Sequence, residues 1–338
     1  MMENGLKHTA GLAARLISGL AVSELVIHTV NHISAWPFIR TYRAYTHLYR
    51  EKGNAGPYKQ QIGSIKGNRT VTVTTPGNPD AKIWFYAPKE RSQLLPVVIY
   101  IHGGGWCTGR ATVVEPFVKT LASQGYLVAN VDYALAPEYP WPVPVRQLCG
   151  ALEYVQSHAE EFGGDSSKVF IAGNSAGAHL AACIGAILTD RGLAQKLVPQ
   201  LRLTEHGICG LLLFNGVYNM KTAGSCGYPY FDLLAWGLTG RRDYENDPRI
   251  TELSPVNFVA EDFPPTYITV GDSDPLESQT IEMLKALEDH NAVHTALLWC
   301  DTGAGLPHDY IFNLYRDEAR QSLELMLEFM KKQLEHRF

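Results

Sequence analysis

Short β-type runs alternate with helix-type runs along most of this 338-residue chain, and the alternation restricts its fold more than any other feature. Eight runs rich in β-branched and aromatic residues predict strands at 69–75, 81–87, 96–102, 126–133, 168–173, 208–217, 265–271 and 294–300. Helical periodicity occurs at 112–124, 143–162, 176–191, 277–290 and 309–335. Strands separated by helices predict an α/β fold, in which a mostly parallel eight-stranded sheet carries helices on both faces. The turn residues PGNPD join the first two strands, which we therefore expect to form an antiparallel hairpin.

Two segments do not follow the alternation. Residues 1–60 precede the first strand, and 218–263, rich in Gly, Pro, Tyr and Trp, lie between the sixth and seventh strands. Insertions of this kind usually lie on the surface of an open sheet and often become lids. We therefore predict an N-terminal cap segment at 1–60 and an α/β domain at 61–338, with 218–263 as a lid inserted into it.

The composition permits one large domain and argues against a nucleic-acid partner. With 46% hydrophobic and 19% charged residues, the chain can bury a sizeable core, as one domain with insertions or as two domains. A net charge of −5 provides no basic field for nucleic acid. The six cysteines, which form no C-x-x-C pair, favour buried thiols in a reducing compartment over a metal site or a disulfide framework.

The stretch 11–36 is distinctly apolar, although charged residues interrupt it. Its continuous part is about a dozen residues long, which is short of the ~20 needed to cross a bilayer. No cleavage pattern of a secretory signal peptide follows it. We predict an amphipathic helix that covers another part of a cytoplasmic protein, with contact to a membrane surface as the alternative. The sequence makes no prediction of the oligomeric state.

The stretch VFIAGNSAGAHLAA places Ser175 between two glycines, immediately after the fifth strand and before a helix. In open α/β sheets, ligands bind at the carboxyl ends of the strands. Gly173, Ser175 and Gly177 form G-x-S-x-G, the pattern of a nucleophile elbow. Small residues around the serine let strand and helix approach through a strained turn, which exposes the hydroxyl. The motif alone is a weak signal, because glycine and serine are common residues.

A glycine run, HGGG at 102–105, directly follows the third strand. Because glycine has no Cβ, backbone N–H groups in such a run can face a carbonyl oxygen that becomes negatively charged during acyl transfer. A phosphate-binding loop is the alternative, but neither G-x-x-x-x-G-K-[ST] nor G-x-G-x-x-G accompanies the run. The run therefore favours an oxyanion hole.

A serine nucleophile also needs a base and an acid that orients the base. The seventh strand is followed by Asp272 and Asp274, and the eighth by His308. The chain order Ser, Asp, His is the one that this sheet topology implies, with each residue on a loop at a carboxyl strand end. Asp272 competes with Asp274 for the role of the acid, since both leave the same strand.

Together these motifs resemble those of the α/β-hydrolases, specifically the hormone-sensitive-lipase-like carboxylesterases and the bacterial esterases of the α/β-hydrolase-3 type. The resemblance covers 81–330 and rests on HGGGW, DYALAPEYPWP, GNSAG, SPVNF, DPL and HDY. It implies the α/β-hydrolase fold with a helical cap, and makes 61–338 the catalytic domain. It also implies Ser175 as nucleophile, Asp274 as acid and His308 as base. The oxyanion amides that it implies are those of Gly104, Gly105 and Ala176.

Some positions depart from the family pattern. Asn174 stands where the family often has Asp, and Ala134 where it often has Arg, while ESQ follows DPL in place of RDE. These departures concern the surroundings of the catalytic groups and the identity of the substrate. Trp106 and Asn174 are our candidates for the substrate pocket, although large aromatic residues more often pack in a core or a lid.

Other chemically capable side chains near the motifs have simpler explanations. We expect His102 to be a buried residue that orients the glycine loop, and His179 to be a packing residue of the helix after Ser175. Cys107 lies beside the glycine loop without an evident base, which favours an inert thiol.

The sequence thus predicts a serine hydrolase that cleaves small-molecule carboxylic esters of short to medium acyl chain length, without a metal or other cofactor. One alternative is an amidase or formamidase that uses the same three residues. A peptidase is a second alternative, which the HGGG run disfavours, and a non-catalytic homologue that binds small molecules is the third. The presence of all three candidate residues favours an enzyme over a binding protein.

Overall fold

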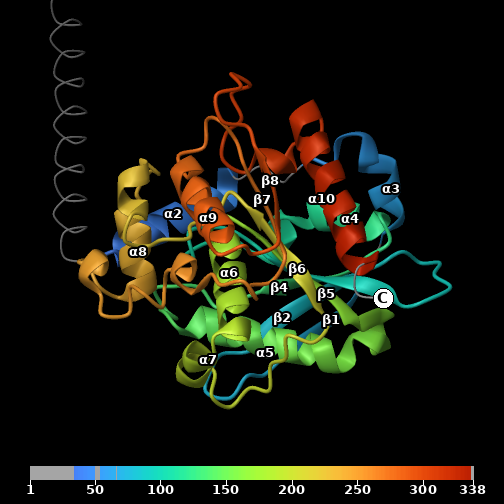
Figure 1. The fold of residues 1–338 in the computed structure, drawn as a ribbon, viewed down its shortest axis with the longest axis horizontal. Helices are drawn as coiled ribbons and strands as arrows, with labels where there is room; N and C mark the ends of the chain where they lie inside the picture. The colour runs from blue at the N-terminus through green and yellow to red at the C-terminus, as the bar shows by residue number, and fades with distance from the viewer. Residues whose placement is uncertain (1–33, 50–53, 66, 336–338) are drawn as a thin grey trace, which may run out of the picture.

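The computed structural model describes residues 34–49, 54–65 and 67–335. Its centre is one eight-stranded sheet in the order β1-β2-β4-β3-β5-β6-β7-β8 (Figure 1). The strands are β1 (Gly67–Val73), β2 (Ala81–Tyr86), β3 (Leu95–Ile101), β4 (Leu127–Asp132), β5 (Gly164–Asn174), β6 (Ile208–Phe214), β7 (Thr266–Val270) and β8 (His294–Leu298). β2 is antiparallel to both of its neighbours, whereas every strand pair from β4 to β8 is parallel. The predicted hairpin and the mostly parallel sheet are therefore confirmed.

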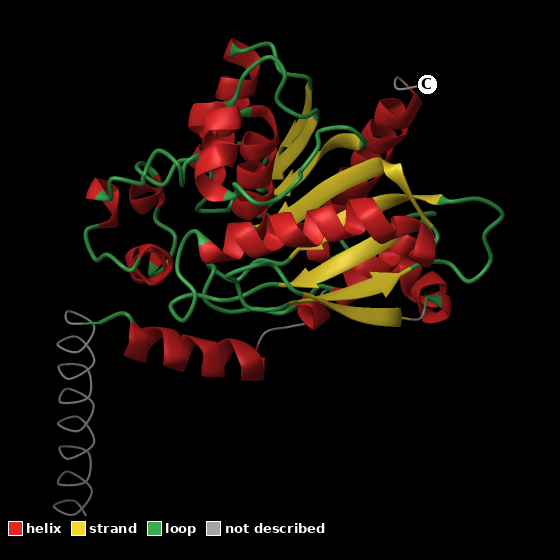
Figure 2. Cartoon of the chain, turned by 90° about the horizontal axis from the view of Figure 1, so that it is seen from below, coloured by secondary structure: helices red, strands yellow, loops and turns green. Residues whose placement is uncertain are grey.

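Helices cover both faces of the sheet (Figures 1 and 2). One face carries α4 (Glu115–Ser123) and α10 (Asp317–Glu335); the other carries α5 (Val143–His158), α6 (Ala176–Thr189) and α9 (Glu277–Asp289). The remaining described α-helices are α2 (Trp36–Tyr49), α3 (Lys59–Ser64), α7 (Arg191–Leu197) and α8 (Phe231–Thr239).

The central strand β3 shows why these runs form a buried sheet. Val97, Ile99 and Ile101 belong to the core shared with α5 and α6. Val98 and Tyr100 belong to the second core, shared with α4 and α10. Successive side chains of a strand point to opposite faces, so a strand covered on both sides needs an uninterrupted apolar run rather than an alternating one.

The main difference from the prediction lies at the start of the last helix. The sequence predicts a helix over 309–335, but α10 begins at Asp317 and a 3₁₀ turn occupies Tyr310–Phe312. Asp309 has a φ of +62°, which a right-handed helix cannot contain. The apolar and acidic periodicity of 309–316 therefore belongs to a loop that lies at the edge of the sheet.

Parts of the two segments outside the alternation pack against each other beside the glycine run. A Cβ on Gly237 of α8 would lie 2.6 Å from Ile39 Cδ1 of α2 and 2.8 Å from Cys107 Sγ. The rings of Phe38 and Tyr230 lie 4.9 Å apart, centroid to centroid. Glycine at 237 thus permits a close contact of the two helices with the glycine loop.

Residues 11–33 of the predicted amphipathic helix lie outside the described part of the chain. Across residues 34–49, 54–65 and 67–335, no helix combines the length and the apolar character that a membrane crossing requires.

Candidate active site

The sheet register brings the predicted site residues to one edge. Ile101, Gly173 and Leu213, near the carboxyl ends of β3, β5 and β6, stand in adjacent positions across the sheet. Val270 and Leu298 are paired at the corresponding ends of β7 and β8. The loops that follow these strands carry the glycine run, Ser175, the two aspartates and His308, so parallel pairing gathers residues that are far apart in the sequence.

Ser175 occupies a sharp turn between β5 and α6. Its backbone has φ 54° and ψ −124°, and its side chain is buried. A Cβ on Gly173 would overlap the carbonyl carbon of Gly177, and a Cβ on Gly177 would overlap the backbone oxygen of Ile101. No side chain fits at either position, which explains why glycines flank the serine at these distances in the sequence.

The glycine run forms a tight turn on the other side of Ser175. Gly104 and Gly105 have φ values of +131° and +57°, a region that glycine adopts without steric cost. The N–H groups of Cys107 and Thr108 donate to Gly104 O at 3.2 Å and 3.0 Å. Ala176, whose amide is the third predicted oxyanion donor, is the first residue of α6. Helix N-termini favour negative charge.

Asp274 and His308 are in direct contact. His308 Nδ1 lies 3.0 Å from Asp274 Oδ1 and 2.9 Å from Oδ2. The carboxylate also accepts hydrogen bonds from the Leu276 N–H at 2.9 Å and from the side-chain amide of Asn215. Asp274 is 4% exposed, so these donors replace the water that the charge loses on burial.

Asp272, the competing candidate, has a different set of partners. It accepts hydrogen bonds from the backbone N–H groups of Gly305 and Leu306 and from the Thr302 hydroxyl. These donors, led by the Leu306 N–H, lower the pKa of Asp272. Asp272 therefore supports the loop that leads to His308, whereas Asp274 contacts the imidazole itself.

Ser175 and His308 line one cavity of about 240 Å³ at this edge of the sheet. Its wall is formed by Tyr42, Tyr45, Thr46, Gly104, Ser175, Tyr228, His308 and Asp309. The Tyr228 ring approaches the His308 ring edge-on, with centroids 5.1 Å apart. Three tyrosines from α2 and from 218–263 thus surround the hydroxyl and the imidazole.

Trp106 and Asn174, the two residues predicted for the substrate pocket, do not line this cavity. Trp106 is 1% exposed, and its indole N–H donates to His179 Nδ1 at 3.0 Å. Asn174 is completely buried behind Ser175. Both side chains therefore lie beneath the site, where hydrogen-bond partners hold them: His179 for Trp106 and Asp309 for Asn174.

His179 is a neutral histidine held by two hydrogen bonds. Its Nδ1 accepts from Trp106 and its Nε2 lies 2.8 Å from Leu253 O, which assigns the proton to Nε2. Burial lowers its pKa from the usual 6.5 to about 4. This side chain does not face the cavity, in agreement with the packing role expected from the sequence.

The protonation of His179 predicts a loss of stability in acid. Unfolded His179 binds a proton near pH 6.5, whereas the folded chain resists it until about pH 4. The unfolded state therefore binds more protons in this window, and the free energy of unfolding falls, as pH drops from 6.5 to 4, by on the order of 3 kcal/mol. Urea titrations at several pH values across this range will measure this change in the free energy of unfolding.

A His179→Gln variant provides the control for this effect, because glutamine can accept from Trp106 and donate to Leu253. It should show a shallower pH dependence than the parent chain, since the carboxylates titrate equally in both. An identical pH dependence in the two proteins would contradict the assignment.

Sequence reasoning missed three residues that organise the site. Asn215 follows β6 and donates to Asp274; its position at a carboxyl strand end is a signal that could have identified it. Asp309 follows His308 and lines the cavity. Arg43 of α2 donates to Cys107 O at 2.5 Å and pairs with Glu138 at 2.6 Å, which joins α2 to the glycine loop; no local pattern indicates this contact.

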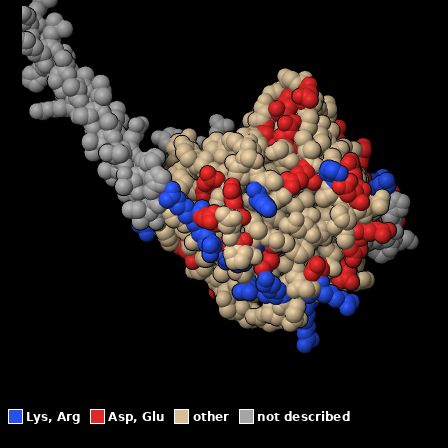
Figure 3. All heavy atoms as spheres, turned by 60° about the vertical axis from the view of Figure 1, so that its left-hand side comes forward, with Lys and Arg blue, Asp and Glu red and all other residues tan. Residues whose placement is uncertain are grey.

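The thiols and the charged surface do not suggest another chemistry. None of the six cysteines, all of which lie in the described residues, forms a disulfide. Burial raises the pKa of the Cys107 thiol to about 12, which makes it a poor nucleophile. Acidic and basic side chains are interspersed on the face shown in Figure 3. Among the described residues, no cluster of His, Cys, Asp or Glu has the arrangement of a metal site.

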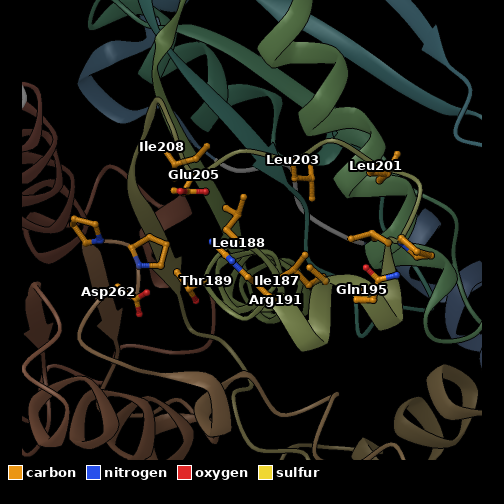
Figure 4. Close-up of a pocket in the computed structure, with 15 residues that line it drawn as sticks. Ile187, Leu188, Thr189, Arg191, Gln195, Leu201, Leu203, Glu205, Ile208 and Asp262 are labelled. Atoms are coloured by element: carbon orange, nitrogen blue, oxygen red, sulfur yellow. The ribbon is translucent and has the colours of Figure 1, made fainter.

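A larger cavity of about 670 Å³ lies elsewhere, between the end of α6, α7 and the loop into β6 (Figure 4). Leu188, Leu201 and Leu203 are among its apolar lining, and Arg191 and Glu205 are among its charged residues. It reaches Ile208, the first residue of β6, and therefore the end of that strand opposite to the Ser175 site. Within the described part of the chain, its lining contains no serine, cysteine or histidine.

Comparison with known proteins identifies the family and the fold. Residues 83–287 match the BD-FAE family. The chain is 32% identical over 212 residues to carboxylesterase NlhH of Mycobacterium tuberculosis, a match that covers 61% of this chain and 64% of that protein. To esterase LipI of the same species it is 31% identical over 237 residues, covering 66% and 71%. The structure of esterase B from Lactobacillus rhamnosis, 20% identical, has a TM-score of 0.74 and covers 90% of this chain and 96% of that one.

Proposed function

Because the chain belongs to the hormone-sensitive-lipase-like α/β-hydrolases, with a BD-FAE match over more than half its length, we propose that it hydrolyses small-molecule carboxylic esters through Ser175, His308 and Asp274. The proposal rests on the arrangement of three side chains. Ser175 and His308 line the same cavity, and the Asp274 carboxylate contacts His308 Nδ1, the ring nitrogen opposite to the one that would act as base.

In this mechanism His308 acts through its Nε2 atom. With Nδ1–H donated to Asp274, Nε2 carries the lone pair and takes the proton of Ser175 as the hydroxyl oxygen attacks the ester carbonyl carbon. Asp274 stabilises the imidazolium that forms. His308 then protonates the leaving alcohol, which departs and leaves an acyl group on Ser175.

The charge on the carbonyl oxygen needs donors that are already in place. The amides of Gly104, Gly105 and Ala176 are our candidates, since Gly104 lines the cavity beside Ser175 and Ala176 begins α6. Loss of one such donor typically lowers kcat by about 10²–10³-fold. Water then attacks the acyl-enzyme, with His308 as base, and releases the acid.

We propose that α2 and the segment 218–263 act together as the cap. The cavity is lined by Tyr42 and Tyr45 of α2 and by Tyr228 of this segment. The hydrogen bond from the Arg43 guanidinium to Cys107 O attaches α2 to the glycine loop. A cavity of about 240 Å³ that three aromatic rings line and that is partly open to solvent accommodates a short or medium acyl chain.

The ester series from p-nitrophenyl acetate to palmitate tests this reading. We expect the highest kcat/KM at about eight acyl carbons or fewer, with a fall of at least about tenfold towards palmitate. A maximum at palmitate would contradict a pocket of this small volume. An N-terminal segment that meets lipid would then become the better explanation.

An amidase that uses the same residues is the competing activity. Paired assays of 4-nitrophenyl acetate and 4-nitroacetanilide separate the two, because the acyl group is shared and only the scissile bond differs. We expect turnover of the ester in large excess over the amide. We also propose a cytoplasmic location, because none of the six cysteines forms a disulfide and cytoplasmic proteins usually keep their thiols reduced.

A further inference from the structure

Asn174 lies beneath Ser175 and connects two loops of the site. Its Nδ2 donates to both carboxylate oxygens of Asp309, at 2.9 Å and 3.0 Å. Its Oδ1 accepts from the Gly103 N–H at 2.9 Å and from the Tyr100 hydroxyl at 3.3 Å. The side chain is completely buried, so these partners replace water. One amide thus joins the glycine loop to the residue after His308.

The chemistry of the partners fixes the orientation of this amide. A carboxylate only accepts hydrogen bonds, and a backbone N–H only donates. The NH₂ group of Asn174 must therefore face Asp309, and its oxygen must face Gly103. Packing allows little adjustment, because a Cβ on Gly103 would lie 2.6 Å from Asn174 Nδ2.

Asp309 is also close to the reacting face of His308. Its Oδ1 lies 3.9 Å from His308 Nε2, the atom opposite to the one held by Asp274. Asp309 has a φ of +62° and lines the same cavity as Ser175. Asn and Asp are the non-glycine residues that best tolerate this left-handed backbone.

We propose that Asn174 and Asp309 are a positioning pair for the hydrolysis proposed above, on which this inference rests. Asn174 fixes the oxyanion loop and the His308 loop relative to each other. Asp309 supplies a carboxylate that favours the imidazolium formed when His308 takes the Ser175 proton. The amide at 174 is required because a carboxylate there would face the Asp309 carboxylate at hydrogen-bond distance.

Other groups that face His308 do not supply a competing positive charge. Asp274 contacts Nδ1, and Tyr228 approaches the ring edge. Tyr42 and Tyr45 of α2 line the cavity, together with Ser175 at the start of α6. No lysine or arginine is among the described residues that line this cavity.

The test is a reciprocal exchange of the two side chains. The variants are Asn174→Asp, Asp309→Asn and the double variant. In the double variant, the carboxylate introduced at position 174 can accept from Gly103 and Tyr100, while the amide introduced at position 309 donates to that carboxylate. The hydrogen bonds to Gly103 and Tyr100 and one hydrogen bond between positions 174 and 309 are then retained, and the negative charge moves from position 309 to position 174. Asp301→Asn is the matched control, because it removes an exposed carboxylate, also at positive φ, from the chain between β8 and His308.

The readout is kcat/KM against pH for p-nitrophenyl acetate. Asp309→Asn should move the acidic limb to lower pH by about one unit, the size expected for one charge about 4 Å away in water-like surroundings. Asn174→Asp should lower kcat at least about tenfold and move the limb to higher pH. The double variant should recover kcat to within about threefold of the parent, and Asp301→Asn should match the parent throughout.

A fluorophosphonate label on Ser175, followed against pH, separates this inference from the proposed function. An active parent chain whose acidic limb stays in place in Asp309→Asn, or whose kcat is unaffected by Asn174→Asp, overturns the pair. The absence of rescue in a folded double variant does the same. A parent that neither reacts with the label nor turns over any ester overturns the hydrolysis proposal itself. If Asn174→Asp fails to fold, the acidic limb of Asp309→Asn and the kcat of the double variant decide whether the positioning pair stands.

Discussion

Replacement of Ser175 by alanine will remove ester hydrolysis and leave the fold intact. The serine oxygen is the atom that forms the acyl-enzyme in the proposed mechanism, and no other hydroxyl in the described cavity wall shares its place on the turn before α6. Loss of a serine nucleophile typically lowers kcat by about 10⁴–10⁶-fold. Alanine keeps the Cβ, so the backbone at φ 54° experiences the same strain as in the parent.

The matched control for this prediction is Ser273→Ala. Ser273 is exposed, lies at the same edge of the sheet, and donates only its backbone N–H to Leu306 O among the described hydrogen bonds. It should retain full activity. Circular dichroism and thermal unfolding of both variants check the fold, and a folded Ser175→Ala protein that still turns over p-nitrophenyl acetate would refute the nucleophile assignment.

The second large effect is expected from Asp274→Asn. Asparagine can present an NH₂ group to His308 Nδ1 and thereby favour the wrong tautomer, which leaves a proton on Nε2, the atom that must act as base. The geometry supports this, since both carboxylate oxygens of Asp274 lie within 3.0 Å of Nδ1. A fall in kcat of about 10⁴-fold is the precedent for this substitution in a serine triad.

Asp272→Asn is the informative comparison because it removes the other carboxylate that follows β7. Asp272 accepts from the loop 302–306 and does not contact the imidazole, so we expect a loss of activity below about tenfold and a lower melting temperature. Rates measured at saturating substrate compare the two variants directly. A larger loss of kcat in Asp272→Asn than in Asp274→Asn would reverse our assignment of the acid.

The strand pattern and the motifs predicted the scaffold well, for a local reason. Runs such as 96–102 must be apolar on both faces when helices cover both sides, and the run is visible without knowledge of any partner. A Cβ on Gly173 would overlap the backbone of Gly177, which is a contact within the five-residue turn. A Cβ on Gly177 would overlap Ile101 of β3, which is a contact made only in the folded sheet. The predicted start of the final helix is wrong because 309–316 has helical periodicity but Asp309 adopts a positive φ.

The contacts of the cap and of the residues around the triad could not be predicted from the sequence in this way. Arg43 reaches Cys107 and Glu138 across 64 and 95 residues of sequence, and its side chain carries no periodic signal. Asn215 and Asp309 occur at loop positions where any polar residue is ordinary. Trp106 and Asn174 looked like pocket residues from their neighbours in sequence, yet their hydrogen bonds to His179 and Asp309 place them beneath the surface of the site.

The sequence by itself determined the alternation of strands and helices, the turn at Ser175, the glycine loop and the order of the candidate acid and base. Each of these depends on backbone conformation or periodicity, which neighbouring residues control. The family resemblance favoured Asp274 over Asp272, and the tertiary structure brings Asp274 into contact with His308. Only the tertiary structure decided which tyrosines line the cavity with Ser175. It also decided that Asn174 joins two loops rather than lining a pocket. Those distinctions depend on contacts between segments far apart in the chain, where a side chain's role is set by the partner it meets after folding.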